Sequence, residues 1–153
     1  MESEMENVSM NSKMKLSEHF TLGEFTKTKH KTADGNIPSH AVIENLKRLC
    51  PWLEELRRRY NEPIIINSGY RSPAVNKLAG GSNASNHLTG CAVDIRCAGK
   101  EQMIRYASIL LDIADSTKQD YDELLLELHG SVCWLHFAVR PKDNRRKIEF
   151  LKS

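Results

Sequence analysis

The sequence predicts an α+β fold in which a small antiparallel sheet is flanked by helices. Apolar residues recur at helical spacing in two segments, residues 39–56 and 100–115. Short apolar or alternating runs typical of strands occur at residues 63–67, 91–97, 123–128, 133–139 and 147–151. The helices precede and separate these strands without a regular βαβ repeat, which favours α+β over a doubly wound sheet.

The chain has 153 residues, enough for one domain with a sizeable core. We assign residues 16–153 to this domain and the polar, acidic residues 1–15 to a flexible tail. The tail has neither the basic nor the apolar region of a secretory signal, so we expect a chain that is cytoplasmic as synthesised. A net charge of +2 gives no support for nucleic-acid binding. No apolar run approaches the roughly 20 residues of a membrane span, and we expect a monomer.

The first helices follow from local signals. Residues 16–25 mix aromatic and polar side chains and predict a short, partly helical lead-in, and residues 26–38 read as a loop. Ser39 is a suitable N-cap for the helix that follows. Pro51 would bend or break this helix, so either one bent helix or two successive helices are expected.

The remaining elements alternate between strands and helices. A turn at residues 68–73 follows the first strand and leads into a short helix that ends near residues 80–81. The strands at 123–128 and 133–139 are joined through residues 129–131, and the strand at 147–151 is expected at an edge of the sheet.

The four cysteines, Cys50, Cys91, Cys97 and Cys133, show no C-x-x-C spacing. Without an export signal, free buried thiols are the expected state. Cys91 and Cys97 share the parity of the apolar residues in their strand, which indicates small core residues rather than metal ligands.

The most informative stretch is S-x-H-x-x-G-x-A-x-D at residues 85–94. It places His87 and Asp94 on either side of Gly90, whose missing Cβ permits a turn that folds one toward the other. A second histidine, His136, follows in a Trp-x-His run. Two imidazoles and one carboxylate form a zinc set that leaves a fourth position open. The alternative for each residue alone is an exposed polar side chain.

Strand periodicity supports the same grouping independently of the motif. Alternate side chains of a strand face opposite ways. Asp94, His136 and Glu127 each occupy the parity opposite to the apolar residues of their own strand. All three are therefore expected on the face of the sheet that turns away from the core.

Glu127 follows three leucines, so we expect partial burial and a raised pKa, which suit a carboxylate that accepts and returns protons. An edge-strand glutamate that points to solvent is the alternative. His129, two residues further on, competes as a ligand or proton carrier and is ranked second.

Arg71 lies in the turn Ser68-Gly69-Tyr70-Arg71-Ser72-Pro73, which would fix its guanidinium. Close to a metal it could pair with a substrate carboxylate or stabilise a developing oxyanion. The alternative is a surface arginine that caps a turn. The other histidines, His19, His30 and His40, are assigned no role.

These segments resemble the zinc D-Ala-D-Ala peptidase family, whose fold is shared by VanX-type dipeptidases and the Hedgehog signalling domain. Residues 16–22 resemble the start of its small phage- or prophage-associated branch. The resemblance extends over residues 16–151 and is carried by the segments 68–73, 80–94, 121–127 and 134–136.

The resemblance implies one zinc ion per chain on His87, Asp94 and His136, with Glu127 as the catalytic base and Arg71 as a cation on the substrate side. The implied reaction is hydrolysis of a peptide bond in peptidoglycan stem peptides or cross-bridges. We further assign Arg71, Ser85 and Trp134 to substrate binding.

Three readings of the function remain open on the sequence. The first is a peptidoglycan peptidase, a D,D-carboxypeptidase or an endolysin-type endopeptidase, released to the wall by a holin-type route. The second is a non-catalytic zinc-binding or interaction domain of the same fold. The third is an intracellular dipeptidase that acts on free D-Ala-D-Ala.

Overall fold

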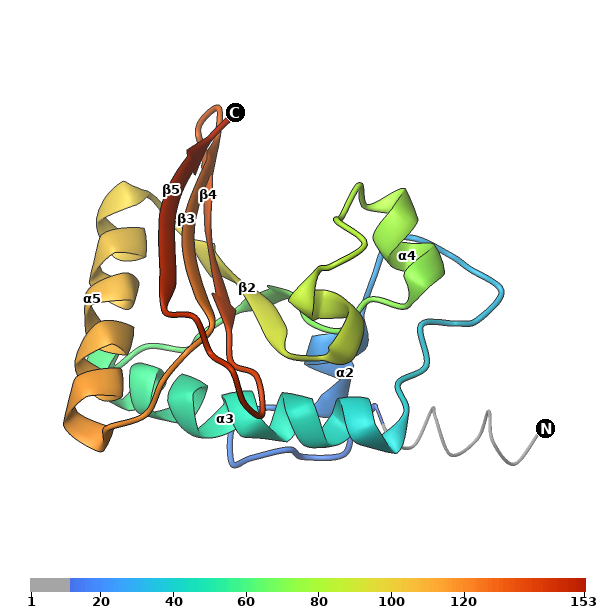
Figure 1. Ribbon diagram of the computed structural model, residues 1–153, viewed down its shortest axis with the longest axis horizontal. Coiled ribbons are helices and arrows are strands. Elements are labelled where there is room, and N and C mark those ends of the chain that lie inside the picture. The colour runs from blue at the N-terminus through green and yellow to red at the C-terminus, as the bar shows by residue number, and fades with distance from the viewer. Residues whose placement is uncertain (1–11) are drawn as a thin grey trace.

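A computed structural model describes residues 12–153 (Figure 1). The fold is α+β, as predicted, with one five-stranded sheet and helices on either side of it. In the described chain the helices are α2 (Leu22–Thr26), α3 (His40–Tyr60), α4 (Pro73–Leu78), the 3-10 helix η1 (Asn86–Thr89) and α5 (Lys100–Thr117). The strands are β1 (Ile66–Ser68), β2 (Ala92–Cys97), β3 (Glu123–His129), β4 (Val132–Ala138) and β5 (Lys147–Lys152).

The sheet has the order β1-β2-β4-β3-β5, and its first four strands pair antiparallel. β5 pairs parallel with β3, so the sheet is mixed rather than purely antiparallel as predicted. β4 ends at Ala138 opposite Glu123, the first residue of β3. The chain then reverses and begins β5 at Lys147 beside the same Glu123. β5 therefore runs in the direction of β3, as an edge strand.

The core lies between one face of the sheet and the two long helices. α5 packs against β2, β3 and β4, and α3 packs against α5 (Figure 1). The buried side chains include Leu46, Leu53, Leu110 and Phe137, each at most 1% exposed. The opposite face of the sheet is turned toward α4 and η1 (Figure 1), so it is free to carry polar side chains.

Helix α3 begins as predicted and runs without a break. The Ser39 hydroxyl accepts a hydrogen bond from the Val42 amide at 3.2 Å, which satisfies one of the free N–H groups of the first turn. Pro51 lies inside one continuous helix of 21 residues rather than between two. Trp52 and Leu53, directly after it, are buried in the core. This burial offsets the cost of the backbone hydrogen bond that proline cannot donate.

Gly90 makes the turn that the motif predicted. It ends η1 with a φ of +76°, a left-handed conformation that glycine adopts at low cost. A Cβ at this position would lie 2.8 Å from both Cγ1 and the carbonyl oxygen of Val42. The glycine therefore lets the end of η1 pack directly against α3.

Residues 1–11 of the predicted tail lie outside the described residues. Residues 12–15 contact the domain: the amides of Leu22 and Gly23 donate to the carbonyls of Met14 and Ser12, each at 2.8 Å. The lead-in is partly helical through α2, as predicted.

All four cysteines are buried and free, in agreement with the sequence prediction. Within residues 12–153, no helix combines the length and the apolar character needed to cross a membrane.

Candidate metal centre

His87, Asp94 and His136 converge on the polar face of the sheet. One potential ligand atom from each residue lies within 4.8 Å of the others. Asp94 Oδ1 is 3.3 Å from His87 Nε2 and 3.1 Å from His136 Nδ1. All three side chains are buried. The structure thus brings together the three residues that the sequence proposed as ligands, from η1, β2 and β4.

The register of the sheet places two of them. Asp94 and His136 are direct partners in the antiparallel β2–β4 pair, and such cross-strand neighbours share a face. His87 comes from η1, whose N-cap is Ser85. The Ser85 hydroxyl accepts from the His87 amide at 3.1 Å. Ser85 was predicted to bind substrate; here its hydroxyl caps the helix that carries a ligand.

The His87 ring is oriented by a backbone carbonyl. Its Nδ1 donates to the Gly69 carbonyl at 2.6 Å, so the proton resides on Nδ1. The unprotonated Nε2 faces Asp94, where it is available to bind a metal. Gly69 approaches α2 closely, because a Cβ there would lie 2.6 Å from the Phe25 carbonyl oxygen. The Gly69-Tyr70-Arg71 turn therefore sets the tautomer of His87, a candidate ligand.

The His136 ring is held by a carboxylate that the sequence reasoning missed. Its Nε2 lies 2.9 Å from Glu123 Oε1, which accepts the ring proton and leaves Nδ1 directed at Asp94. Two signals in the sequence bear on Glu123: it shares its parity with Glu127 on β3, and it lies in the segment 121–127 that carries the family resemblance. Its contact with His136 depends on the pairing of β3 with β4, which the sequence does not specify.

Glu123 belongs to a wider polar network. Asn86 donates to Glu123 Oε1 at 2.6 Å and lies 2.8 Å from Asp122 Oδ2. Asp122 is completely buried and accepts from Arg145 Nε and Nη2 at 3.0 and 2.8 Å, with Arg140 Nε 3.2 Å away. Burial raises the pKa of Glu123, but the hydrogen bond and the charge of His136, together with the hydrogen bond from Asn86, lower it further, and the net shift is downward. Glu123 is therefore held as a carboxylate.

The three residues fit a zinc ion. Two neutral imidazoles and a carboxylate are ligands that zinc accepts, and each imidazole has its other nitrogen bonded to an oxygen. Burial opposes the charge on Asp94, yet the neighbouring imidazoles, His87 foremost, lower its pKa overall. Its Oδ2 is held by Arg71 Nη2 at 3.2 Å, while Oδ1 faces the two rings. One polar atom of each side chain thus faces the other two residues and is available to a metal. The second polar atom of each side chain is bonded to a neighbouring group.

Glu127 lies in the same cleft, opposite Trp134 in the β3–β4 register. The Trp134 indole donates to Glu127 Oε2 at 2.9 Å. Burial, assisted by the charge of Asp94, raises the pKa of Glu127 above its usual 4.5, as the sequence predicted. Trp134 was predicted to contact substrate; in this structure its nitrogen orients the carboxylate.

Arg71 also reaches the centre. Besides its contact with Asp94, its Nε donates to Ser68 Oγ at 3.2 Å, and its amide donates to the His87 carbonyl at 3.0 Å. His129, in contrast, is exposed at the β3–β4 hairpin, where its ring lies 2.9 Å from Ser153 Oγ. It does not line the cleft.

The cleft over the centre has a volume of about 530 Å³. Its walls come from the segment between α4 and η1 on one side and from β3, β4 and β5 on the other. Ser85 and Trp134 both line it. Contacts of these two residues with substrate remain predictions.

A His-Asp-His cluster at the base of a cleft, with a further carboxylate and an arginine beside it, defines a candidate centre for a single divalent metal ion. Residues 18–120 match the model of the Peptidase M15 family, and the chain belongs to that family of metallopeptidases. The matched segment contains Arg71, His87 and Asp94; Glu127 and His136 follow it. No curated protein was found to match the chain.

Proposed function

We propose that the protein is a zinc-dependent peptidase that hydrolyses peptide bonds in peptidoglycan stem peptides or cross-bridges. One observation carries the proposal: the three potential ligands converge within 4.8 Å at the base of a cleft that Glu127 and Arg71 also line. Membership of the Peptidase M15 family supports hydrolysis of a peptide.

The cleft would supply three kinds of chemistry. His87, Asp94 and His136 would hold the zinc ion, which would supply Lewis-acid polarisation of a carbonyl and lower the pKa of water. Glu127 takes the proton from the attacking water and delivers it to the leaving amine. Its raised pKa brings it closer to neutrality, where both transfers are feasible.

Two neighbours keep these groups in place. The indole of Trp134 fixes one oxygen of Glu127. Arg71 holds the outer oxygen of Asp94 and presents positive charge to the cleft, where it can bind an anionic group of the substrate or stabilise negative charge on the carbonyl oxygen.

Mass spectrometry of digested peptidoglycan tests the proposal. Purified, zinc-loaded protein is incubated with peptidoglycan and with free D-Ala-D-Ala, with and without a chelator. Released D-alanine indicates a carboxypeptidase, loss of cross-linked fragments indicates an endopeptidase, and cleavage of the free dipeptide alone indicates a dipeptidase. The Glu127→Gln variant is the matched negative control.

A protein that binds zinc but yields no product from any of these substrates would contradict the proposal and favour a non-catalytic zinc-binding domain. Product formation that is unaffected by the chelator would contradict the role of the metal.

A further inference from the structure

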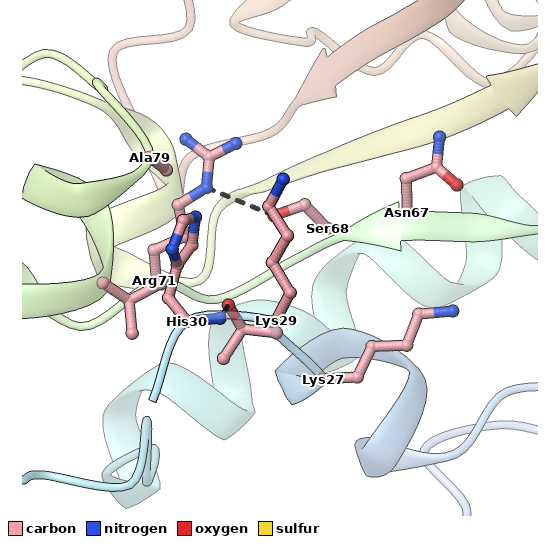
Figure 2. A pocket seen from close by; sticks show the side chains of 9 residues that line it. Lys27, Lys29, His30, Asn67, Ser68, Arg71 and Ala79 are labelled. Carbon is pink, nitrogen blue, oxygen red and sulfur yellow. Dashed lines mark hydrogen bonds between the residues drawn. The ribbon is translucent and has the colours of Figure 1, made fainter. Parts of the chain in front are cut away.

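A second cavity, of about 600 Å³, lies beside the metal-centre cleft and shares Arg71 and Ala79 with it. We call it the basic pocket. It is lined by Lys27, Thr28, Lys29, His30, Asn67, Ser68, Arg71, Val75 and Ala79. Figure 2 shows the Lys29 ammonium and the Arg71 guanidinium on the same side of the pocket, directed the same way. Arg71 thus stands at the boundary between the two cavities.

The charged side chains that line the basic pocket are all positive. Lys27, Lys29 and Arg71 are cations, and no aspartate or glutamate lines the cavity. Within residues 12–153, neither Lys27 nor Lys29 forms an ion pair with a carboxylate. Arg71 pairs with Asp94, whose other oxygen faces the candidate metal centre. Like charges gathered at one concave surface raise the local concentration of anions and favour their binding.

The backbone next to Lys27 is joined to the turn that carries Arg71. Lys27 follows the last residue of α2, and the Tyr70 amide donates to the Phe25 carbonyl at 2.7 Å. The buried amide of Asn36 donates both to the Thr26 carbonyl at 2.8 Å and to the Tyr70 carbonyl at 3.1 Å. The end of α2 is therefore joined to the turn that carries Arg71, both directly and through Asn36.

We propose that the basic pocket binds a carboxylate of the peptide substrate, with Lys27 and Lys29 as the binding cations and Arg71 between this carboxylate and the scissile bond. The proposal rests on the proposed peptidase function. The carboxylate has two possible sources, the C-terminal α-carboxylate of the residue after the scissile bond or an acidic side chain further along the peptide. Both present the same planar anion to ammonium and guanidinium donors.

The first test is a binding measurement that does not depend on hydrolysis. Calorimetry compares glutarate with its neutral analogue glutaramide on the zinc-loaded full chain. The variants are Lys27→Gln, Lys29→Gln and the double variant, and Lys31→Gln is the matched control, because Lys31 belongs to the same loop but does not line the pocket.

We expect each pocket variant to bind glutarate about 3- to 5-fold more weakly, as for a single partly exposed ion pair. The double variant should bind glutarate about 10-fold more weakly. Lys31→Gln should bind glutarate like the wild type, and glutaramide should bind to none of the proteins. Equal glutarate affinity in all the proteins, or an equal loss in Lys31→Gln, would overturn the proposal.

The second test identifies the source of the carboxylate. Steady-state kinetics compare an N-acetylated peptide that ends in D-alanyl-D-alanine, its C-terminal amide, and amidated peptides that carry glutamate or glutamine after the scissile bond. A higher KM in Lys27→Gln and Lys29→Gln, with kcat unchanged, is expected only for peptides that carry the recognised carboxylate. An unchanged KM for every peptide overturns the proposal. If no peptide is hydrolysed, the peptidase function fails, while the glutarate measurement still decides whether the pocket binds carboxylates.

Discussion

His136 Nε2 lies 2.9 Å from Glu123 Oε1, on the neighbouring strand of the sheet. This contact fixes which nitrogen of His136 faces Asp94 and links the candidate metal centre to the buried network around Asp122. A carboxylate in this place makes a ligand imidazole more basic and orients its ring.

We therefore expect Glu123→Ala to weaken zinc binding by about 10- to 100-fold, which is typical when such an outer partner is removed. Glu123→Gln keeps an acceptor oxygen, so its zinc affinity should fall less than that of Glu123→Ala. Competition with a chromophoric chelator measures the affinity. Glu149→Gln is the control, because Glu149 of β5 lies on the same face of the sheet as Glu123 but takes no part in the centre. Equal affinity of Glu123→Ala and wild type would contradict this role.

The two histidines of the C-terminal strands should differ sharply in metal binding. His136→Ala removes one of three candidate ligands, so we expect the zinc content to fall from about one ion per chain to a small fraction of that value. His129→Ala should retain zinc, because His129 lies exposed at the hairpin. Elemental analysis after gel filtration provides the measurement. Zinc retained by His136→Ala would exclude it as a ligand.

Glu127→Gln is expected to keep zinc while its kcat falls by about 10²- to 10⁴-fold, the usual contribution of a general base. The amide still accepts the hydrogen bond from Trp134, so the fold should be preserved. Glu149→Gln is again the matched control. Wild-type turnover in Glu127→Gln would assign the base to another residue.

The pH dependence of kcat/KM should follow Glu127 on its acid side. Burial and the charge of Asp94 raise the pKa of Glu127 above 4.5, and a base must be deprotonated to act. Activity should therefore increase with pH through a midpoint higher than that of an ordinary glutamate. Trp134→Phe removes a hydrogen bond that stabilises the carboxylate and should shift the midpoint upward. A midpoint at or below pH 4.5 would show that another group controls the acid side of the pH profile.

Most of the centre could be predicted because its determinants are local. The spacing of His87, Gly90 and Asp94 describes one turn and one strand, and period-2 alternation placed Glu127 and His136 on the polar face. Glu123 and Asp122 were missed because their roles depend on which strands pair and in what register, and this is set by packing across the sheet.

The direction of β5 escaped prediction for the same reason. The residues 147–151 have the composition of a strand, but its partner is decided by the reversal after β4. The amides of Arg146 and Lys147 donate to the carbonyls of Tyr121 and Asp122, which place the start of β5 beside the start of β3. The basic pocket likewise joins two segments that are far apart in the sequence.

Asp122 gives a prediction about stability rather than catalysis. Burial raises the pKa of this carboxyl, but the hydrogen bonds from Arg145, together with that from Asn86, lower it below the ordinary 3.8. A carboxyl whose pKa is lowered by folding stabilises the protein above its unfolded pKa, and this contribution is lost as the pH falls through the folded value. Asp122→Asn should therefore be less stable by about 1–3 kcal/mol at pH 7, because it leaves buried donors with a weaker acceptor.

Urea unfolding of metal-free wild type and Asp122→Asn at pH 7 and near pH 3 measures this contribution. Comparing the two proteins at each pH cancels the protonation of the metal ligands, which affects both alike. The difference in the free energy of unfolding between the two proteins should be largest at neutral pH. It should narrow below about pH 4, where the Asp122 carboxyl of the wild type begins to take up a proton in the unfolded chain. A difference that stays constant over this range would mean that the charge of Asp122 does not stabilise the fold.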